Sequence, residues 1–155
     1  MEGGENTTSL SFNNNGSILA VGRTDGFAKL WDFQKMLVIR NIEFEKERGR
    51  ISSLSWANNI LATGSKENSL FLNDTRQEEP IAELNWHKKE VCGLRFSPDG
   101  SLLASGSNDN TLCIWDIRRS GTPLYEKKNH TAAVKALAWS KRERNILASG
   151  GGSKD

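Results

Sequence analysis

Side chains that together can perform acyl transfer occur twice in this chain, in the same order. The members are His87, Ser105 and Asp109 in the first set and His130, Ser149 and Asp155 in the second. A hydroxyl, an imidazole and a carboxylate make up a catalytic triad, so hydrolysis is the first chemistry to consider. The duplication argues against it, because structural groups recur in every repeat of a protein whereas catalytic groups normally do not. We therefore predict no catalytic residue and no enzymatic activity.

The alternative role for both sets is structural. Trp115 follows the first set, and its indole N–H can donate to the hydroxyl at one end of a hydrogen-bond chain that runs from hydroxyl to imidazole to carboxylate. Such a hydrogen-bond chain satisfies every polar group in a crowded apolar setting. We predict one network of His87, Ser105, Asp109 and Trp115 and a second of His130, Ser149 and Asp155. Earlier in the chain the set is incomplete, so we expect packing to dominate there; what remains is Asp25 and Trp31, then Thr63 and Glu67.

Short strands joined by tight turns would position these groups. Between Glu90 and Arg118 apolar residues alternate with a period of two, and turns at Ser97–Gly100 and Asn108–Asn110 interrupt them. Pro at the second turn position, followed by Asp and Gly, is typical of hairpins. The alternation puts the first strand's side chains on two faces: Val91, Gly93 and Arg95 on one, Cys92, Leu94 and Phe96 on the other.

The unit repeats along the chain. A Trp-Asp pair or its counterpart falls at 31–32, 73–74 and 115–116, at intervals of 42 residues. A small-residue tetrad precedes each pair and occurs a fourth time: Leu19–Gly22, Leu61–Gly64, Leu103–Gly106 and Leu147–Gly150. Four-stranded repeats of about 40–45 residues with this dipeptide are the signature of WD-repeat propeller blades.

The sequence thus predicts an all-β fold, a partial WD-repeat β-propeller with about three and a half blades of an expected total of about seven. We divide the chain into a polar stub and a propeller fragment. The boundaries are 1–7 for the stub and 8–155 for the propeller, with blades at about 8–48, 49–88, 89–130 and, incomplete, 131–155. We expect outer strands at 37–44 in blade one and 123–125 in blade three, and we expect blade four to begin at Ala133 and to end in 146–155. Because a ring needs roughly four to eight blades, we expect a fragment of a longer chain or a chain that another completes.

The amino-acid composition limits the classes of partner and cofactor that we expect. Lys and Arg number 21 against 19 Asp and Glu, so no broad nucleic-acid or membrane footprint is expected. The basic runs at 46–50 and 141–144 are interpreted as solvated turns. The start, Met1–Thr8, has no apolar core and is no secretory signal. Cys92 and Cys113 form neither a disulfide framework nor a metal set, so we expect buried thiols, no metal and no cofactor.

Beyond generic WD repeats, the chain resembles the Fizzy and Fizzy-related family, the co-activators of the anaphase-promoting complex ubiquitin ligase. The segments that carry the resemblance are Glu90–Leu94, Ser97–Gly100, Leu103–Gly106, Asn108–Asn110, His130, Ala133–Trp139 and Asn145–Gly152. The spacing from the aromatic that ends each first strand to the glycine after the second is also similar: 10, 8, 10 and 11 residues in successive blades.

The resemblance implies a non-catalytic adaptor that binds degron motifs of cell-cycle proteins. In the family, the pocket for the Lys-Glu-Asn (KEN) motif uses two asparagines beside the turn aspartate, here Asn108 and Asn110. It also uses a hydroxyl residue after three glycines, here Ser153. Amide side chains both donate and accept, which suits such a ligand. The alternative is that Asn108 and Asn110 only form the turn, since asparagine tolerates left-handed φ.

The implied partners are subunits of the anaphase-promoting complex, degron-containing substrates and spindle-checkpoint proteins, in the cytoplasm and nucleus. The alternative function is a general WD-repeat scaffold for protein assemblies that does not read degrons. Binding of a KEN peptide separates the two, because only the first requires it.

Overall fold

The computed structural model describes residues 6–43, 49–119 and 121–155, and all regular elements in these ranges are β-strands. The first two sheets comprise β1 (Thr7–Phe12), β2 (Ile18–Arg23), β3 (Ala28–Asp32) and β4 (Leu37–Ile42), then β5 (Ile51–Ala57), β6 (Ile60–Ser65), β7 (Leu70–Asp74) and β8 (Ala82–Leu84). The others comprise β9 (Val91–Phe96), β10 (Leu102–Ser107), β11 (Leu112–Asp116) and β12 (Tyr125–Lys127), then β13 (Ala136–Trp139) and β14 (Leu147–Gly150).

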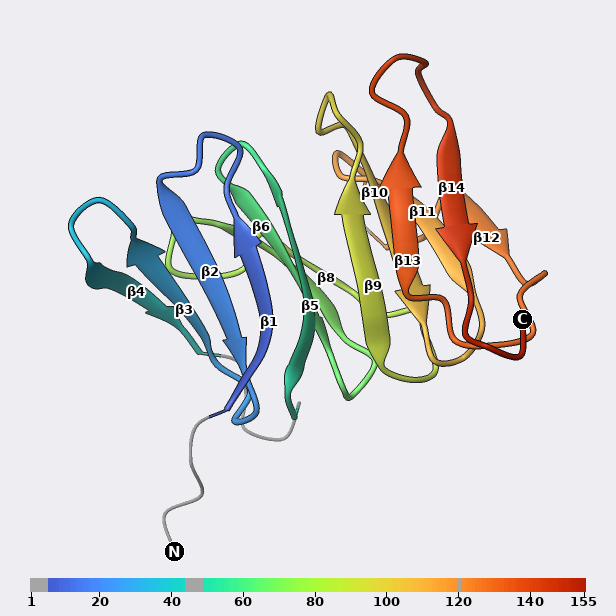
Figure 1. The fold of residues 1–155 in the computed structure, drawn as a ribbon, viewed down its shortest axis with the longest axis horizontal. Coiled ribbons are helices and arrows are strands. Elements are labelled where there is room, and N and C mark those ends of the chain that lie inside the picture. The colour runs from blue at the N-terminus through green and yellow to red at the C-terminus, as the bar shows by residue number, and fades with distance from the viewer. Residues whose placement is uncertain (1–5, 44–48, 120) are drawn as a thin grey trace, which may run out of the picture.

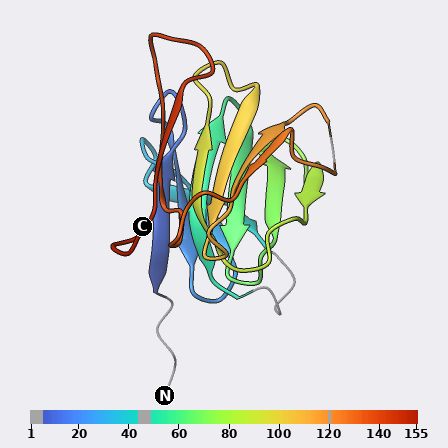
Figure 2. The same cartoon turned by 90° about the vertical axis from the view of Figure 1, so that its right-hand side faces the viewer.

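Each sheet is an antiparallel meander whose strands lie in chain order, and the sheets are called blades one to four below. Figure 1 shows them side by side from the blue end of the chain to the red end. Seen from the side of blade four, they lie one behind another (Figure 2). The predicted all-β repeat architecture is therefore confirmed.

Some strand limits differ from the prediction. The strand expected at 37–44 ends at Ile42, and Phe44 lies outside the described residues, as do Met1–Glu5 of the stub and residues 46–48 of the first basic run. The strand expected at 123–125 lies at Tyr125–Lys127 because pairing with β11 selects it. Blade four's first strand starts at Ala136 instead of Ala133, because the amide of Val134 bonds to Ser107 O of blade three.

Blade four was expected to end in residues 146–155, and within them the strand β14 ends at Gly150. Beyond it the chain turns, and the amide of Asp155 donates to Gly152 O at 2.9 Å. This turn is what places the Asp155 carboxylate beside His130.

The apolar core lies between neighbouring blades. Blades two and three enclose a cluster that includes Leu72, Leu103 and Trp115, and similar clusters fill the other two junctions. The first strands, β1, β5, β9 and β13, contact one another in succession. Each blade therefore buries its faces against its neighbours and not within itself.

The glycine of the small-residue tetrad is explained by this contact. A Cβ atom there would lie 2.8 Å from a γ-carbon of the next blade, closer than packed carbons approach. The glycines are Gly22, Gly64 and Gly106, and the γ-carbons belong to Ile51, Val91 and Val134. Gly150, which ends β14, meets only the Cβ of Ala136, at 3.4 Å.

A β-bulge near the start of each of the first strands of blades one to three changes which side chains share a face. In β9 the register shifts between Val91 and Gly93, and Cys92 is the extra residue. Val91 consequently joins Leu94 and Phe96 in the core, so the two-face assignment made from strict alternation is wrong at Val91 and Cys92. The equivalent shifts in β1 and β5 fall at Thr8 and Ser52.

Candidate functional site

The structure brings His87, Ser105 and Trp115 together inside blade three. The imidazole Nε2 lies 2.7 Å from Ser105 Oγ, and the indole Nε1 donates to the same oxygen at 2.8 Å. Ser105 is fully buried. Its hydroxyl is therefore out of reach of a substrate, and the arrangement acts as internal bonding between strands.

The hydrogen-bond chain continues through Thr111, a residue that the sequence analysis does not identify. Thr111 Oγ1 lies 2.9 Å from His87 Nδ1 and donates in turn to Asp109, whereas the carboxylate itself is 3.4 Å from the imidazole. The sequence pattern that could have identified Thr111 is a hydroxyl residue two positions after a turn aspartate. In such a turn the backbone N–H of that residue donates to the aspartate, as Thr111 N does to Asp109 Oδ1. Burial lowers the pKa of His87, against the opposing charge of Asp109. The imidazole is therefore neutral.

Blade four contains the same set of side chains without a hydroxyl between the imidazole and the carboxylate. His130 Nε2 lies 2.9 Å from Ser149 Oγ, and Nδ1 lies 2.5 Å from Asp155 Oδ2. The hydrogen bond from His130 is the main cause that lowers the pKa of Asp155 to about 2. The carboxylate is therefore ionised at neutral pH.

The first two blades join their strands differently. In blade two Asn73 takes the place of the tryptophan, and its Nδ2 donates to Leu61 O at 3.2 Å and lies 3.5 Å from Thr63 Oγ1. In blade one Asp25 pairs with Arg23. Polar side chains thus contribute in both, in addition to the packing that the sequence predicts.

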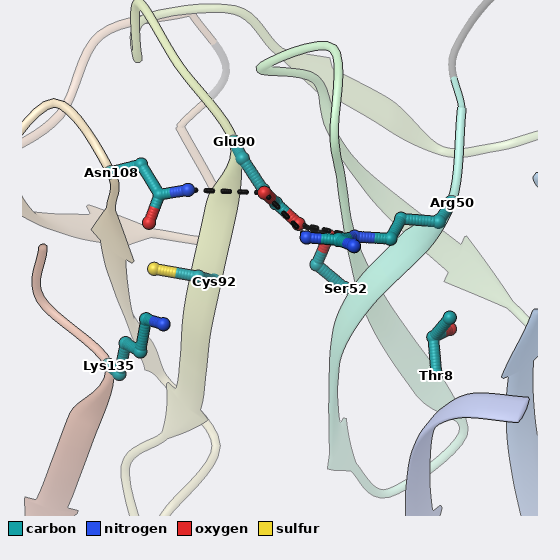
Figure 3. Close-up of a pocket in the computed structure, with 7 residues that line it drawn as sticks. All are labelled: Thr8, Arg50, Ser52, Glu90, Cys92, Asn108 and Lys135. Atoms are coloured by element: carbon teal, nitrogen blue, oxygen red, sulfur yellow. Dashed lines mark hydrogen bonds and ion pairs between the residues drawn. The ribbon is translucent and has the colours of Figure 1, made fainter. Parts of the chain in front are cut away.

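The bulged residues open a polar pocket of about 430 Å³ beside the first strands. Its lining is Thr8, Arg50, Ser52, Glu90, Cys92, Asn108 and Lys135 (Figure 3). Thr8, Ser52 and Cys92 are the bulged residues of three successive blades, and Lys135 precedes β13. Cys92 is consequently half-buried, which corrects the expectation of two buried thiols, while Cys113 is buried.

Glu90 is the electrostatic centre of the pocket. Its carboxylate accepts from Arg50 Nε at 2.8 Å and from Arg50 Nη2 at 3.0 Å, and Ser52 Oγ donates to it as well. The bond from Arg50 is the main cause that lowers the pKa of Glu90. The pair joins blades two and three, so Arg50 is an inter-blade contact and not only part of a solvated turn. The Lys135 ammonium lines the same hollow.

The candidate degron-binding residues lie in different places. Asn108 lines this pocket, and its Nδ2 donates to Glu90 Oε2 at 3.1 Å. Asn110 donates to Thr131 O at 3.2 Å and lines a separate hollow with His130. Ser153 is exposed in the turn that follows β14. The described residues therefore do not gather these three side chains into one pocket.

The turn-former interpretation applies to one asparagine of the two. Asn110 has a φ of 69°, and Asn68 and Gly26 at the same place in blades two and one are also left-handed, at 64° and 87°. Asn108 is not left-handed. Its side chain is partly exposed and faces a pocket, so the requirement of the turn does not account for it.

Two classes of site are not found among the described residues. No helix in those ranges has the length and apolar character to cross a membrane. Nor do three or more His, Cys, Asp or Glu side chains gather there in a way that could hold a metal ion.

Comparison with known proteins first defines the class. The family model "WD domain, G-beta repeat" matches residues 78–116 and 121–155, and the model "Anaphase-promoting complex subunit 4 WD40 domain" matches residues 1–59. The crystal structure of a mitotic checkpoint complex contains a chain that superposes with a TM-score of 0.94 and 37% identity, covering 100% of this chain and 47% of that one. The fold is a WD-repeat β-propeller fold.

Curated relatives then identify the family. The APC/C activator protein CDC20 of Saccharomyces cerevisiae is 45% identical over 97% of this chain and 25% of its own length. Protein FIZZY-RELATED 1 of Arabidopsis thaliana is 40% identical over 97% and 31%, and the anaphase-promoting complex subunit cdh1 of Dictyostelium discoideum is 37% identical over 100% and 25%. The chain belongs to the Fizzy and Fizzy-related family. It spans about a quarter to a third of the length of these relatives.

Proposed function

We propose that this chain contributes to an adaptor of the anaphase-promoting complex that binds short KEN-type degrons of cell-cycle proteins and catalyses nothing itself. The relatives at 37–45% identity support the adaptor role, since they carry the names of activators and subunits of that complex. The likeness to a chain of a mitotic checkpoint complex supports checkpoint proteins as further partners. We also propose that the protein acts in the nucleus and the cytoplasm.

The observation that carries the proposal is the pocket beside the first strands. It offers the amide of Asn108 and the ammonium of Lys135 on opposite sides of Cys92, next to the Arg50–Glu90 pair (Figure 3). A peptide that presents a lysine and a glutamate in succession can place its ammonium at the amide oxygen and its carboxylate at Lys135. The pocket therefore suits a short polar tag better than an apolar one.

A peptide titration tests this function. A fluorescent KEN peptide is titrated with the chain, with Asn108→Ala plus Asn110→Ala, and with the control Asn41→Ala on the outer strand β4. We expect the double substitution to weaken binding about tenfold or more, equivalent to about 1.4 kcal/mol, and the control to leave it unchanged. Equal affinity for the double variant, or for a peptide with all three motif residues changed to alanine, contradicts degron reading.

The second candidate function is a general WD-repeat scaffold. Exposed apolar side chains on blade one favour it: Leu10 and Phe12 on β1 are 62% and 47% exposed, and Val38 and Ile39 on β4 are exposed as well. Such a surface suits an extended protein contact. Indifference to KEN peptides, together with partner binding that Phe12→Ser abolishes, would favour this function over the first.

A further inference from the structure

The side-chain amide of Asn108 is held in one orientation. Its Nδ2 donates to Glu90 Oε2 at 3.1 Å, and its backbone amide donates to Glu90 O at 2.9 Å. Figure 3 shows the amide nitrogen directed at Glu90 and the oxygen turned away from it. An ionised carboxylate can only accept hydrogen bonds, so the NH₂ group must face Glu90 and the carbonyl oxygen must face away.

Glu90 cannot rotate freely to release the amide. Arg50 binds both of its carboxylate oxygens, Ser52 donates to one of them, and the side chain is only 11% exposed. A bidentate guanidinium–carboxylate pair fixes direction as well as distance. Arg50 and Ser52 belong to the neighbouring blade two, whereas Glu90 and Asn108 both belong to blade three. The packing of blades two and three therefore sets the orientation of Asn108.

We propose that Glu90 is a positioning residue that determines specificity: by accepting the N–H of Asn108 it presents the Asn108 oxygen to the pocket, which then selects a ligand side chain with an ammonium donor. This inference rests on the proposed degron-binding function and names the group that makes its lysine subsite selective. An ionised acidic side chain or an apolar one has no hydrogen to donate to this carbonyl oxygen, and the acidic one also finds no N–H donor from Asn108. A neutral donor can bond to the oxygen, but without the added strength of a charged hydrogen bond. Without Glu90 the amide of Asn108 is free to present either end.

Glu90→Gln is the most informative variant. Its Oε1 can still accept from Arg50 and Ser52, while its Nε2 can donate to the Asn108 oxygen and so turn the amide round. Shape and size are kept, while the charge is removed and the oxygen that accepts from Arg50 Nη2 and Asn108 is replaced by a donor. The matched control is Glu79→Gln, an exposed glutamate in the segment between β7 and β8, away from the pocket lining.

The experiment compares two peptides on the full chain, one with the motif lysine and one with norleucine in its place. We expect the chain and Glu79→Gln to prefer lysine about tenfold, as a charged hydrogen bond predicts, and Glu90→Gln to prefer it less than about twofold. Because Glu90 acts through Asn108, adding Glu90→Gln to Asn108→Ala should change the preference no further. A merely structural role of Glu90 would instead weaken both peptides equally and leave their ratio unchanged.

A second readout needs no peptide. In the ¹⁵N spectrum of the chain, the side-chain NH₂ of Asn108 should show one hydrogen-bonded proton that exchanges slowly with water, and Glu90→Gln should remove this protection. Averaged, fast-exchanging NH₂ signals in the unmodified chain would overturn the proposal even where Glu90→Gln does not fold. If the amide is held but neither peptide binds, the degron function fails while the orientation by Glu90 stands. If lysine is preferred equally with and without Glu90, the positioning role fails while the degron function stands.

Discussion

Blades three and four contain the same His-Ser-Asp set in two different environments. The His87 side chain is 1% exposed and its partner Asp109 9%, whereas His130 is 14% exposed and Asp155 21%. Blade three has a third strand, β11, which supplies Trp115, and Thr111 directly precedes that strand; blade four has β13 and β14 in the described residues. In the described residues, the set of blade three is therefore almost fully buried and the set of blade four is partly exposed.

The largest expected difference between the two blades concerns their tryptophans. Trp115→Ala removes a ring that is 1% exposed and leaves Ser105 Oγ without its indole donor, so we expect a loss of about 3–5 kcal/mol in the free energy of unfolding. Trp139→Ala removes a half-buried ring whose indole donates to Arg95 O, and we expect a loss of about 1 kcal/mol. Urea unfolding followed by circular dichroism measures both, and equal losses would contradict the comparison.

The histidines should differ in the same direction by less. His87→Ala opens a cavity and removes the imidazole partner of the buried Ser105 hydroxyl and of the half-buried Thr111 hydroxyl, so we expect a loss of about 3 kcal/mol in the free energy of unfolding. His130→Ala exposes Ser149 and Asp155 to water, which can replace the bonds, and we expect about 1 kcal/mol. The same urea titration measures both losses. A greater loss of stability for His130→Ala than for His87→Ala would show that burial does not determine how much each network stabilises its blade.

The smallest effect is the dependence of stability on pH. The pKa of folded His87 lies below its ordinary value of 6.5, chiefly through burial, so the unfolded chain takes up a proton more readily. The stability from this group is then complete above about pH 6.5 and is lost as the pH falls through the folded pKa. Urea midpoints measured downward from pH 8 should therefore begin to fall below about pH 6.5, and His87→Gln should remove that part of the decline.

Blade four should respond at lower pH. Asp155 has a folded pKa of about 2 against an ordinary value of 3.8, mainly because His130 bonds to it. Its contribution is complete above about pH 4 and is lost as the pH falls toward 2. Carbon-detected titration of the two groups tests the assignment directly. A His87 ring that titrates at 6.5, or an Asp155 carboxyl that titrates at 3.8, would show that the two environments do not differ as described.

Much of the fold could be predicted from sequence because each blade repeats its pattern. The 42-residue interval, the small-residue tetrads and the turn residues each reflect a local requirement, such as the left-handed φ of Asn110. The bulge at Cys92 could not be predicted, because one extra residue reverses the faces of a strand without changing its composition. For the same reason the pocket that the bulged side chains line was missed.

The candidate site was predictable only in part. Asn108 could be singled out by its turn and by the family resemblance, whereas Glu90 and Arg50 meet across a blade junction that no local pattern marks. Thr111 belongs to the blade-three network because its hydroxyl lies between His87 and Asp109. The spacing of residues along the sequence does not give the distances between these side chains, so this role could not be predicted.

If the proposed function holds, the pocket beside the first strands binds short lysine-bearing peptides. The most direct measurement follows the ¹⁵N and ¹³C signals of the chain while a KEN peptide is added. We expect concerted shifts at Asn108, Cys92 and Lys135, which line the pocket, and none on the outer strands β4 and β8. Shifts confined to the outer strands, or saturation without any change at Asn108, would contradict the proposed function.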